Sequence, residues 1–423
     1  MTTTATPAAS AERPAGLRSR DDLPIAIIGA GPIGLAMAAH LVGCGQRFVI
    51  LEAGPEPGHA IRQWSHVGLF TEWANNTDKE AETLLRAAGW RSPDAEVIPT
   101  GGELVRDYLE PLAALPAIRP HLRFGQRVVA VTRRGLDKVK TAGRGERPFL
   151  LQTRTAAGEV LTEARAVIDA SGTWFTTNPL HSSGIWTAAE LAAADRIRYG
   201  LPNVLGPERE RYAGRTTAVV GSGYSAINVI LDLAELRASQ AETTIKWVVR
   251  RDSVDSLLNG TGQDLLLAQG WLGQRLRALV ARGDIELVTS FRVSGIDRKA
   301  DQVVLSETAG RSLRADMVVA ATGFRPDLAL FRELRVDIEP GSEATRGLAS
   351  LIDPNLHSCY TVPVHGAAEL THPESDFFIV GMKSYGRAPT FLLKTGYEQT
   401  RAIAAALSGK APVARPAPVC AAE

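Results

Sequence analysis

The feature that most constrains this chain is a glycine-rich turn, Gly29-x-Gly31-x-x-Gly34, placed between a strand pattern and a helix pattern. Residues 24–28 form a short, apolar, partly β-branched run that predicts a buried strand. Residues 35–41 predict a helix, and 48–51 predict a second buried strand that ends at Glu52. Together these segments predict a β-α-β unit of about 30 residues. Such a unit belongs to a parallel sheet that is covered by helices.

Each glycine of this turn has its own physical reason. The first permits the tight turn, the second lets a pyrophosphate approach the backbone, and the third lets helix and strand pack closely. The start of the helix offers amide donors and a favourable dipole to an anion, and an acid at the end of the second strand can accept from ribose hydroxyls. The sequence therefore predicts a dinucleotide site. The alternative is a chance glycine turn with a solvated glutamate. We assign to the site Gly29, Gly31, Pro32, Gly34 and Glu52.

The same order of elements returns later, with a strand pattern at 216–220, a glycine turn, a helix pattern at 227–236 and a strand pattern at 244–249. Alanine is accepted as the third residue of the turn. This second strand ends in two arginines rather than an acid, and arginine binds a 2′-phosphate bidentately. The sequence therefore predicts NADPH rather than NADH here. The alternatives are a solvated strand end, or an ion pair with Asp252 or Asp255. We assign to this site Gly221, Gly223, Tyr224, Ser225, Ala226, Arg250 and Arg251.

Each repeat also contains segments that alternate apolar and polar residues, which predict an antiparallel meander. These segments lie at 127–132, 149–153 and 160–164 in the first repeat, and at 286–313 in the second. We therefore expect an α/β protein with two Rossmann-like, doubly wound, three-layer domains, each with a meander. The first domain is expected from 23–172 and 316–410, and the second is inserted at 173–315. A disordered leader at 1–22 and a flexible tail at 411–423 complete the chain.

Two nucleotide sites in one chain indicate an electron carrier, and FAD at the first site with NADPH at the second satisfies that need. Cys44, Cys359 and Cys420 are the three cysteines, and none belongs to a C-x-x-C pair, so a dithiol relay is disfavoured. The net charge of +1 indicates neither nucleic acid nor membrane as partner. No secretory signal and no spanning run is present. We expect a cytoplasmic enzyme whose oligomeric state is a monomer or a homodimer.

The two repeats resemble the flavoproteins with two dinucleotide-binding domains. Residues 321–327 resemble their second ATG motif, where the chain re-enters the FAD domain, and 169–172 resemble the first crossing. The resemblance covers about residues 23–408. It implies cofactor contacts from Ser171, Gly172, Thr322, Gly323, Asp327, Gly381 and Met382, and an adenine contact from Val128.

Within that superfamily the chain resembles the flavin-containing monooxygenases. Residues 76–80 are similar to their N-x-P-K-E segment, which implies that Asn76 lies beside the flavin. Three features depart from the pattern: Asp78 replaces the proline, the F-x-G-x-x-x-H fingerprint is absent, and Gly381 is followed by Met382 instead of an acid. The resemblance is therefore to a divergent member.

The candidate catalytic residues are Asn76, Trp64 and Cys359. Arg62, Trp64 and Asn76 are expected to wall the flavin, with Trp174 in the same cavity, because large rigid aromatics exclude water. The alternative is that Trp64, Trp73 and Trp90 fill a core under a long loop. Cys359, His357 or His365 is expected near the substrate, where a thiol would suit a trivalent arsenical. The alternative is that this segment is a surface or interdomain turn.

The sequence thus predicts an NADPH-dependent FAD monooxygenase. It would use O2 to oxygenate a soft heteroatom (S, N or trivalent As) or a carbonyl of a small molecule through a C4a-(hydro)peroxyflavin. One alternative is an NADPH-dependent flavin reductase or oxidase without oxygen insertion. Another is a flavin-based redox-sensing protein with negligible turnover. No metal-site spacing is present.

Overall fold

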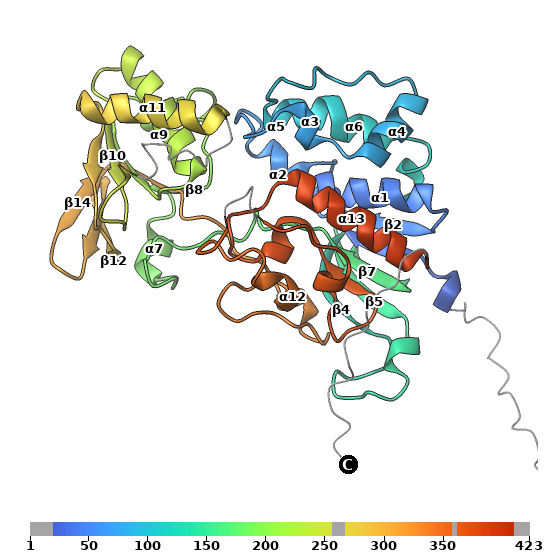
Figure 1. The fold of residues 1–423 in the computed structure, drawn as a ribbon. Helices are drawn as coiled ribbons and strands as arrows, with labels where there is room; N and C mark the ends of the chain where they lie inside the picture. The colour runs from blue at the N-terminus through green and yellow to red at the C-terminus, as the bar shows by residue number, and fades with distance from the viewer. Residues whose placement is uncertain (1–19, 256–266, 358–361, 410–423) are drawn as a thin grey trace, which may run out of the picture.

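The computed structural model describes residues 20–255, 267–357 and 362–409, which form two α/β domains side by side (Figure 1). The first domain has a five-stranded parallel sheet in the order β16-β7-β1-β2-β3. Its strands are β1 (Ile25–Ile28), β2 (Phe48–Leu51), β3 (Leu122–Arg123), β7 (Ala166–Asp169) and β16 (Phe377–Ile379). The central strands are buried on both faces, as expected for a parallel sheet between two layers.

The two faces of this sheet are covered differently. Ile25 and Ile27 pack towards α1 (Pro32–Gly43) and α13 (Leu393–Leu407). Ala26 and Ile28 pack towards the antiparallel meander of β4 (Arg127–Arg133), β5 (Phe149–Thr155) and β6 (Gly158–Ala164). Because side chains alternate along a strand, one four-residue strand contributes to both cores.

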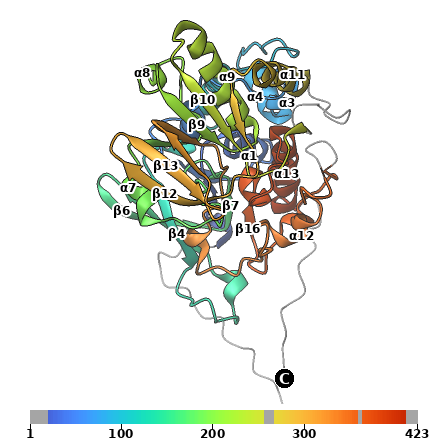
Figure 2. The same cartoon turned by 90° about the vertical axis from the view of Figure 1, so that its left-hand side faces the viewer.

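The second domain repeats this plan with a parallel sheet in the order β11-β10-β9-β15-β8 (Figure 2). Its strands are β8 (Ile197–Tyr199), β9 (Thr216–Val220), β10 (Thr244–Val248), β11 (Glu286–Val288) and β15 (Met317–Ala320). Helices α9 (Tyr224–Ser239) and α11 (Leu267–Ala281) lie on one face. The meander of β12 (Val293–Lys299), β13 (Gln302–Glu307) and β14 (Ser312–Ala315) lies on the other.

The predicted fold class is confirmed, and two boundaries need correction. β15 pairs with β9 and β8, so residues 317–320 belong to the second domain and the return to the first comes after Ala321, not at 316. β11 pairs with β10 in the parallel sheet, so the second meander begins at Val293 rather than at 286. Both errors have one cause, since a short apolar run does not reveal which sheet it joins.

A helical lobe, residues 54–118, is inserted between β2 and β3. Its longest helical stretch consists of α5 (Gly101–Leu104), the π-helical η2 (Val105–Leu109) and α6 (Glu110–Ala114) in succession. The stretch before it contains α2 (His59–Arg62), α3 (Trp73–Asn76) and α4 (Lys79–Ala87). Asp78, which replaces the proline of N-x-P-K-E, caps α4 by accepting from the amides of Glu80 and Ala81.

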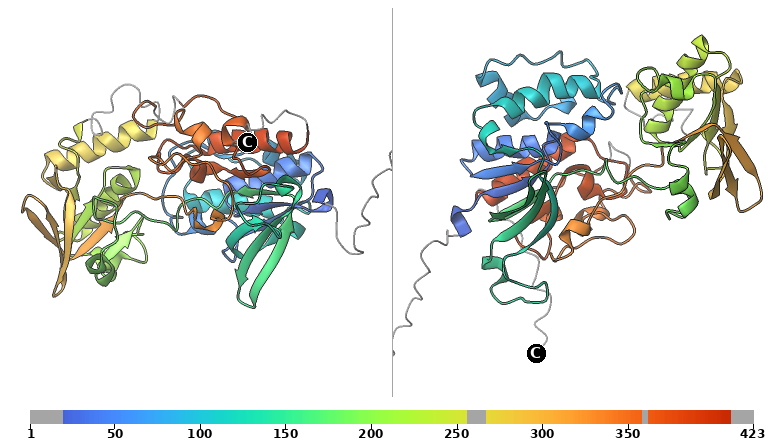
Figure 3. Two further views of the ribbon diagram at one scale, coloured as in Figure 1. Left: turned by 90° about the horizontal axis from the view of Figure 1, so that it is seen from below. Right: turned by 180° about the vertical axis from the view of Figure 1, so that it is seen from behind.

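Short helices fill the remaining connections. In the first domain they are η1 (Arg20–Asp22), η3 (Arg119–His121), η4 (Arg144–Glu146), η5 (Ala329–Phe331), α12 (Arg346–Ala349), η6 (Ala368–Leu370) and η7 (Gly381–Tyr385). In the second domain they are α7 (Ala188–Ala192) and α8 (Arg209–Tyr212). The views from below and behind show two bodies joined by the chain segments that pass between them (Figure 3).

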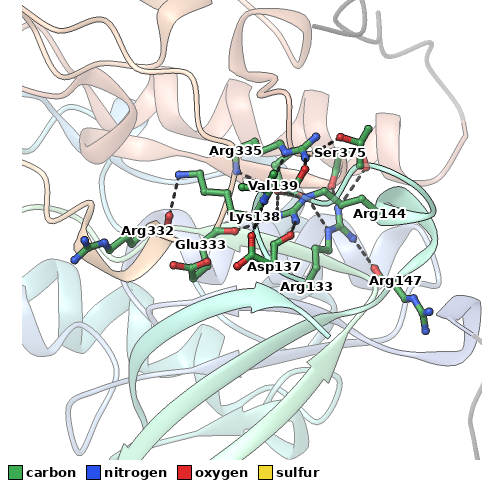
Figure 4. Close-up of polar contacts among 12 residues, drawn as sticks. Arg133, Asp137, Lys138, Val139, Arg144, Arg147, Arg332, Glu333, Arg335 and Ser375 are labelled. Carbon is green, nitrogen blue, oxygen red and sulfur yellow. Dashed lines mark hydrogen bonds and ion pairs between the residues drawn. The ribbon is translucent and has the colours of Figure 1, made fainter. Parts of the chain in front are cut away.

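Ion pairs between buried side chains link the first meander to the C-terminal part of its domain (Figure 4). Glu374 accepts from Arg133 Nε at 2.7 Å and from Arg144 Nη2 at 2.7 Å, and all three side chains are buried. The guanidiniums also donate to backbone carbonyls of Arg147, Asp137 and Glu333. Burial would raise the pKa of Glu374, but the hydrogen bonds from Arg144 and Arg133 hold that pKa below its usual value.

Candidate functional site

The first glycine turn leaves an open, amide-lined surface at the start of α1. Gly29 has φ +100°, and a Cβ on it would lie 2.8 Å from the carbonyl oxygen of Ala170. A Cβ on Gly34 would lie 2.0 Å from the oxygen of Gly29, so this position requires glycine. Gly31 is the N-cap of α1, no side chain caps the helix, and a Cβ on Gly31 would meet nothing within 4 Å. With Pro32 in the first turn, the helix start is shaped for an anion.

The second turn repeats this geometry at α9. Gly221 has φ +140°, and a Cβ on it would lie 2.2 Å from the oxygen of Ala321. Gly223 is the N-cap of α9, again without a side-chain cap and with open space above it. Tyr224 and Ser225 begin the helix, and Ala226 is fully buried against the sheet. Both turns lie at the carboxyl edge of a parallel sheet, where such folds bind their ligands.

Glu52 is buried at the end of β2, and its carboxylate spans the glycine turn. Its two oxygens accept from the amide of Ala30 at 2.7 Å and from that of Gly54 at 2.6 Å. The amide of Gln126 donates to the backbone oxygen of Glu52, which brings the start of β4 beside the acid. Val128 follows two residues later and is half-buried. Glu52 and the start of β4 therefore lie together beside the first turn, and the adenine contact of Val128 stays a prediction.

In the second domain, the position equivalent to Glu52 is apolar. Ile28 pairs with Leu51 and Val220 pairs with Val248, so the residue after each strand end is Glu52 in one domain and Val249 in the other. Arg250 and Arg251 follow and are exposed. Among the described residues neither guanidinium forms an ion pair, while Asp252 and Asp255 bond to Ser290 and Ser253.

Two crossing segments, 173–178 and 322–325, run antiparallel between the domains. Thr177 and Phe324 form a bridge pair, and the amide of Asn178 donates to the oxygen of Gly323 at 2.9 Å. The Asn178 side chain donates to the oxygen of Thr322 at 3.1 Å, and the Thr322 hydroxyl donates to the Asn178 oxygen at 2.8 Å. Sequence reasoning missed Asn178, and the Thr322 hydroxyl is committed to this ribbon.

An aromatic junction of Trp64, Trp174 and Phe324 lies where the lobe and the two crossings meet. The Trp64 and Trp174 rings are 6.2 Å apart, and the Trp174 and Phe324 rings are 4.9 Å apart. Trp64 and Trp174 were expected in one cavity, and the structure does bring them together. Phe324 lies within the segment 321–327 that resembles the ATG motif, but it was not assigned to a site from the sequence.

Two more contacts tie the lobe to the second domain. Phe70 packs on Tyr224, the first residue of α9, with 4.5 Å between ring centroids. The His66 Nε2 lies 3.2 Å from the carbonyl oxygen of Pro202. Burial lowers the pKa of His66, although the hydrogen bond to Pro202 partly opposes this. The lobe therefore borders both nucleotide turns.

Other predicted site residues have local contacts. Asn76 is buried; its amide donates to the oxygens of Thr71 and Glu72, and its own oxygen accepts from the Thr71 hydroxyl. Arg62 pairs with Glu56 and Glu110. Their contact with flavin stays a prediction, as does that of Asp327, which is exposed and accepts from the amide of Ala329. Trp73 is buried, and the half-buried Trp64 and Trp90 pack against the same core, which favours the core-filling alternative for all three.

The histidine and cysteine segment near 357–366 is only partly described. Cys359 lies outside the described residues, and His357 is half-buried beside that gap. His365 is buried: its Nδ1 lies 3.1 Å from the Pro363 oxygen and its Nε2 lies 3.1 Å from Gln399 Nε2. Gln399 in turn accepts from the amide of Gly381. His365 thus supports the turn at Gly381, and its proximity to substrate stays a prediction.

Gly381 and the two residues after it come from the C-terminal part of the chain and lie beside the first turn of α1. Gly381 has φ +69°, and a Cβ there would lie 3.1 Å from Ile33 in α1. Met382 is half-buried. Lys383 is fully buried and pairs with Asp169 at the end of β7, with 2.7 Å between Nζ and Oδ2. Sequence reasoning missed this pair, because it joins a strand end to a turn far along the chain.

The chain matches a family model described as pyridine nucleotide-disulphide oxidoreductase over residues 26–345. That range includes both glycine turns, both crossings, the second sheet and all strands of the first sheet except β16. The chain belongs to this family. It is therefore a flavin-dependent pyridine-nucleotide oxidoreductase.

Solved structures share the whole fold at low identity. Bacillithiol disulfide reductase from Bacillus cereus is 17% identical with a TM-score of 0.66, and the alignment covers 92% of this chain and 99% of that one. Flavin-containing monooxygenase from Stenotrophomonas maltophilia is 20% identical with a TM-score of 0.57, covering 92% and 98%. A curated relative, nitric oxide reductase FlRd-NAD(+) reductase of Escherichia coli O7:K1, is 28% identical, but the match spans 30% of each chain.

The two sites of this family member fit FAD and a pyridine nucleotide. Each has an uncapped helix start with open space over its second glycine, which is the shape that a diphosphate requires. The described residues include no group of three or more potential metal ligands. In the same part of the chain, no helix has the length and apolar character needed to cross a membrane. A separate cavity of about 390 Å³, between α1, α4 and α13, contains no residue of either turn.

Proposed function

We propose that this flavoprotein is an NADPH-dependent FAD monooxygenase that transfers oxygen from O2 to a soft heteroatom or a carbonyl of a small molecule. The aromatic junction is the observation that carries the proposal. Trp64, Trp174 and Phe324 pack on one another where the two crossings meet the lobe, and we infer that they cover the reaction space between the nucleotide sites. Oxygen insertion needs a reaction space without water, whereas simple electron transfer does not.

The chain's own residues supply binding and positioning. The start of α1 and Glu52 hold the diphosphate and ribose of FAD, and the start of α9 with Arg250 and Arg251 holds NADPH. The aromatic junction excludes water. FAD held at the first site would supply the redox chemistry with the nicotinamide and with oxygen.

A reductase or oxidase without oxygen insertion is the second candidate, and the family and the bacillithiol disulfide reductase fold likeness favour it. Disulfide reduction by a protein dithiol is disfavoured by the sequence, since the three cysteines include no C-x-x-C pair. Cys44, the free cysteine of the described residues, lies at the C-cap of α1, the opposite end from Gly31.

The decisive experiment measures where the electrons go. Purified protein with FAD, NADPH and ¹⁸O2 is incubated with thioethers, amines, ketones and trivalent arsenicals. We expect one class to yield ¹⁸O-labelled product in near-stoichiometric ratio to NADPH. NADPH consumption that yields only hydrogen peroxide with every class would reject oxygen insertion. Negligible consumption under all conditions would instead favour the redox-sensing alternative.

Trp174→Ala tests the role of the aromatic junction. We expect the fraction of NADPH electrons lost as peroxide to rise several-fold, because water and oxygen enter the reaction space more freely. Trp186→Ala is the matched control, since Trp186 packs on Tyr199 at the surface of the second domain. An equal rise in both variants would contradict the assignment of Trp174.

A further inference from the structure

A fully buried charge pair lies beneath the first glycine turn. Lys383 and Asp169 have side chains that are 1% and 0% exposed, and Nζ lies 2.7 Å from Oδ2. Nζ also lies 3.1 Å from the hydroxyl of Ser171 and 4.9 Å from the centroid of the Phe331 ring. The other Asp169 oxygen accepts from the amide of Ser171 at 3.1 Å. Lys383, Asp169 and Ser171 thus form one connected unit.

This unit touches the surface where the diphosphate of FAD would bind. Ser171 is exposed, although Lys383 beneath it is not. The Cα of Ser171 lies only 3.1 Å from the position of an added Cβ on Gly29, the first residue of the turn. Gly381, two residues before Lys383, contacts Ile33 in the first turn of α1. Ser171 therefore connects the ammonium group to the segment that lies against the first residue of the glycine turn.

The second domain shows that the fold does not require this pair. Asp169 pairs with Ile28 in the first sheet, and Ala320 pairs with Val220 at the same position of the second sheet. Ala320 is buried and apolar, and the domain closes around it with the same glycine turn. Burying two charges is costly, and apolar replacements of such pairs are often as stable. The pair in the first domain therefore calls for a role other than folding.

We propose that Lys383 is a cation of the FAD site. Asp169 offsets most of the charge of the ammonium group, so Lys383 acts on the diphosphate of FAD through the exposed Ser171 hydroxyl, which accepts from Nζ and keeps its own proton to donate. The proposal depends on FAD binding and is independent of oxygen insertion.

The test compares FAD affinity with the stability of the deflavinated full-length chain. Lys383→Met keeps the apolar stem and removes the charge, but it leaves Asp169 buried without a partner. The double variant Lys383→Met, Asp169→Asn removes both charges and keeps similar shapes. Lys394→Met, which removes an exposed lysine on α13, is the control for a general change in charge. Dissociation constants for FAD come from fluorescence titration, and melting temperatures from the same samples.

We expect the double variant to melt within a few degrees of the original protein and to bind FAD at least tenfold more weakly. Riboflavin, which lacks the diphosphate, should bind both proteins equally. Original FAD affinity in the double variant, with a loss in Lys383→Met alone, would overturn the proposal and leave the pair a structural one. A parallel loss for riboflavin would also overturn it. Neither result depends on whether the enzyme forms an oxygenated product.

Discussion

The two nucleotide domains share a backbone and differ in the charges placed on it. Gly29 and Gly221 make the same close approach to a neighbouring strand end, and Gly31 and Gly223 leave the same open helix start. The residue after the second strand, in contrast, is Glu52 in one domain and Val249 in the other, followed by two exposed arginines. The two domains thus share the geometry of an anion-binding helix start, and we propose that the side chains at the strand ends select the nucleotide.

A second difference concerns how each meander is attached. The first is tied to residues beyond 370 by the buried Arg133–Glu374–Arg144 cluster. In the second, Glu307 pairs with the half-exposed Arg311 four residues away, and the long-range pairs Arg298–Asp195 and Arg196–Asp301 are open to solvent instead of buried. The first domain is assembled from two distant parts of the chain, so its meander needs a long-range attachment. The inserted domain is nearly continuous in sequence.

Glu374→Gln should give the largest effect among tests of this comparison. It leaves two buried guanidiniums without their carboxylate, which costs about 3–5 kcal/mol. For a domain of this size the melting temperature should fall by roughly 10 °C. Glu307→Gln is the matched control in the second meander and should change the melting temperature little. Equal shifts for both variants would contradict the difference in attachment.

Acid sensitivity should also belong to the first domain. Burial lowers the pKa of His372 to about 4, and Asp337 only partly opposes this. Because the folded-state pKa is depressed, the protein loses stability as pH falls from the unfolded value of about 6.5 towards 4, by about 3 kcal/mol in all. His372→Asn, which keeps an acceptor for the Asp337 amide, should remove that part of the pH dependence.

Chemical unfolding at pH 7 and pH 4.5 measures this effect directly. His121→Asn, at an exposed histidine, is the control and should keep the pH dependence of the original protein. The second domain has only His181 between residues 173 and 321. If His372→Asn left the difference between the two pH values unchanged, His372 would not be the group that titrates.

The comparison also shows what a sequence can predict. Both glycine turns were predicted correctly, because each depends on backbone conformations within a few residues. The sheet to which β15 belongs was predicted wrongly. The run Met317–Ala320 is apolar on both faces, so its sequence is compatible with the sheet of either domain. Asn178 and the Lys383–Asp169 pair were missed for a related reason, since each joins segments that only the tertiary fold brings together.

The third position of the glycine turn is Gly34 in the first domain and Ala226 in the second, so each residue can be replaced by the other type. Gly34→Ala places a methyl group 2.0 Å from the Gly29 oxygen, so the turn must shift, at about 1–3 kcal/mol and with weaker FAD binding. Ala226→Gly, at the same position of the second turn, should cost about 1 kcal/mol or less and leave FAD binding unchanged. Melting curves and FAD titrations of both variants check this. Similar FAD losses would mean that the two turns are not independent sites.

Arg250→Gln should give the smallest change in free energy. It tests most directly the difference in charge between the strand ends of the two domains. If Arg250 binds the 2′-phosphate, kcat/KM for NADPH should fall about tenfold, which is about 1.4 kcal/mol, and kcat/KM for NADH should not change. Arg154→Gln, at an exposed arginine in β5, is the control. A change that is equal for both nucleotides would mean that Arg250 acts on the diphosphate or on the fold. In that case the strand end would contribute only the absence of an acid, because Val249 stands there. Any preference for NADPH would come from other residues of the chain.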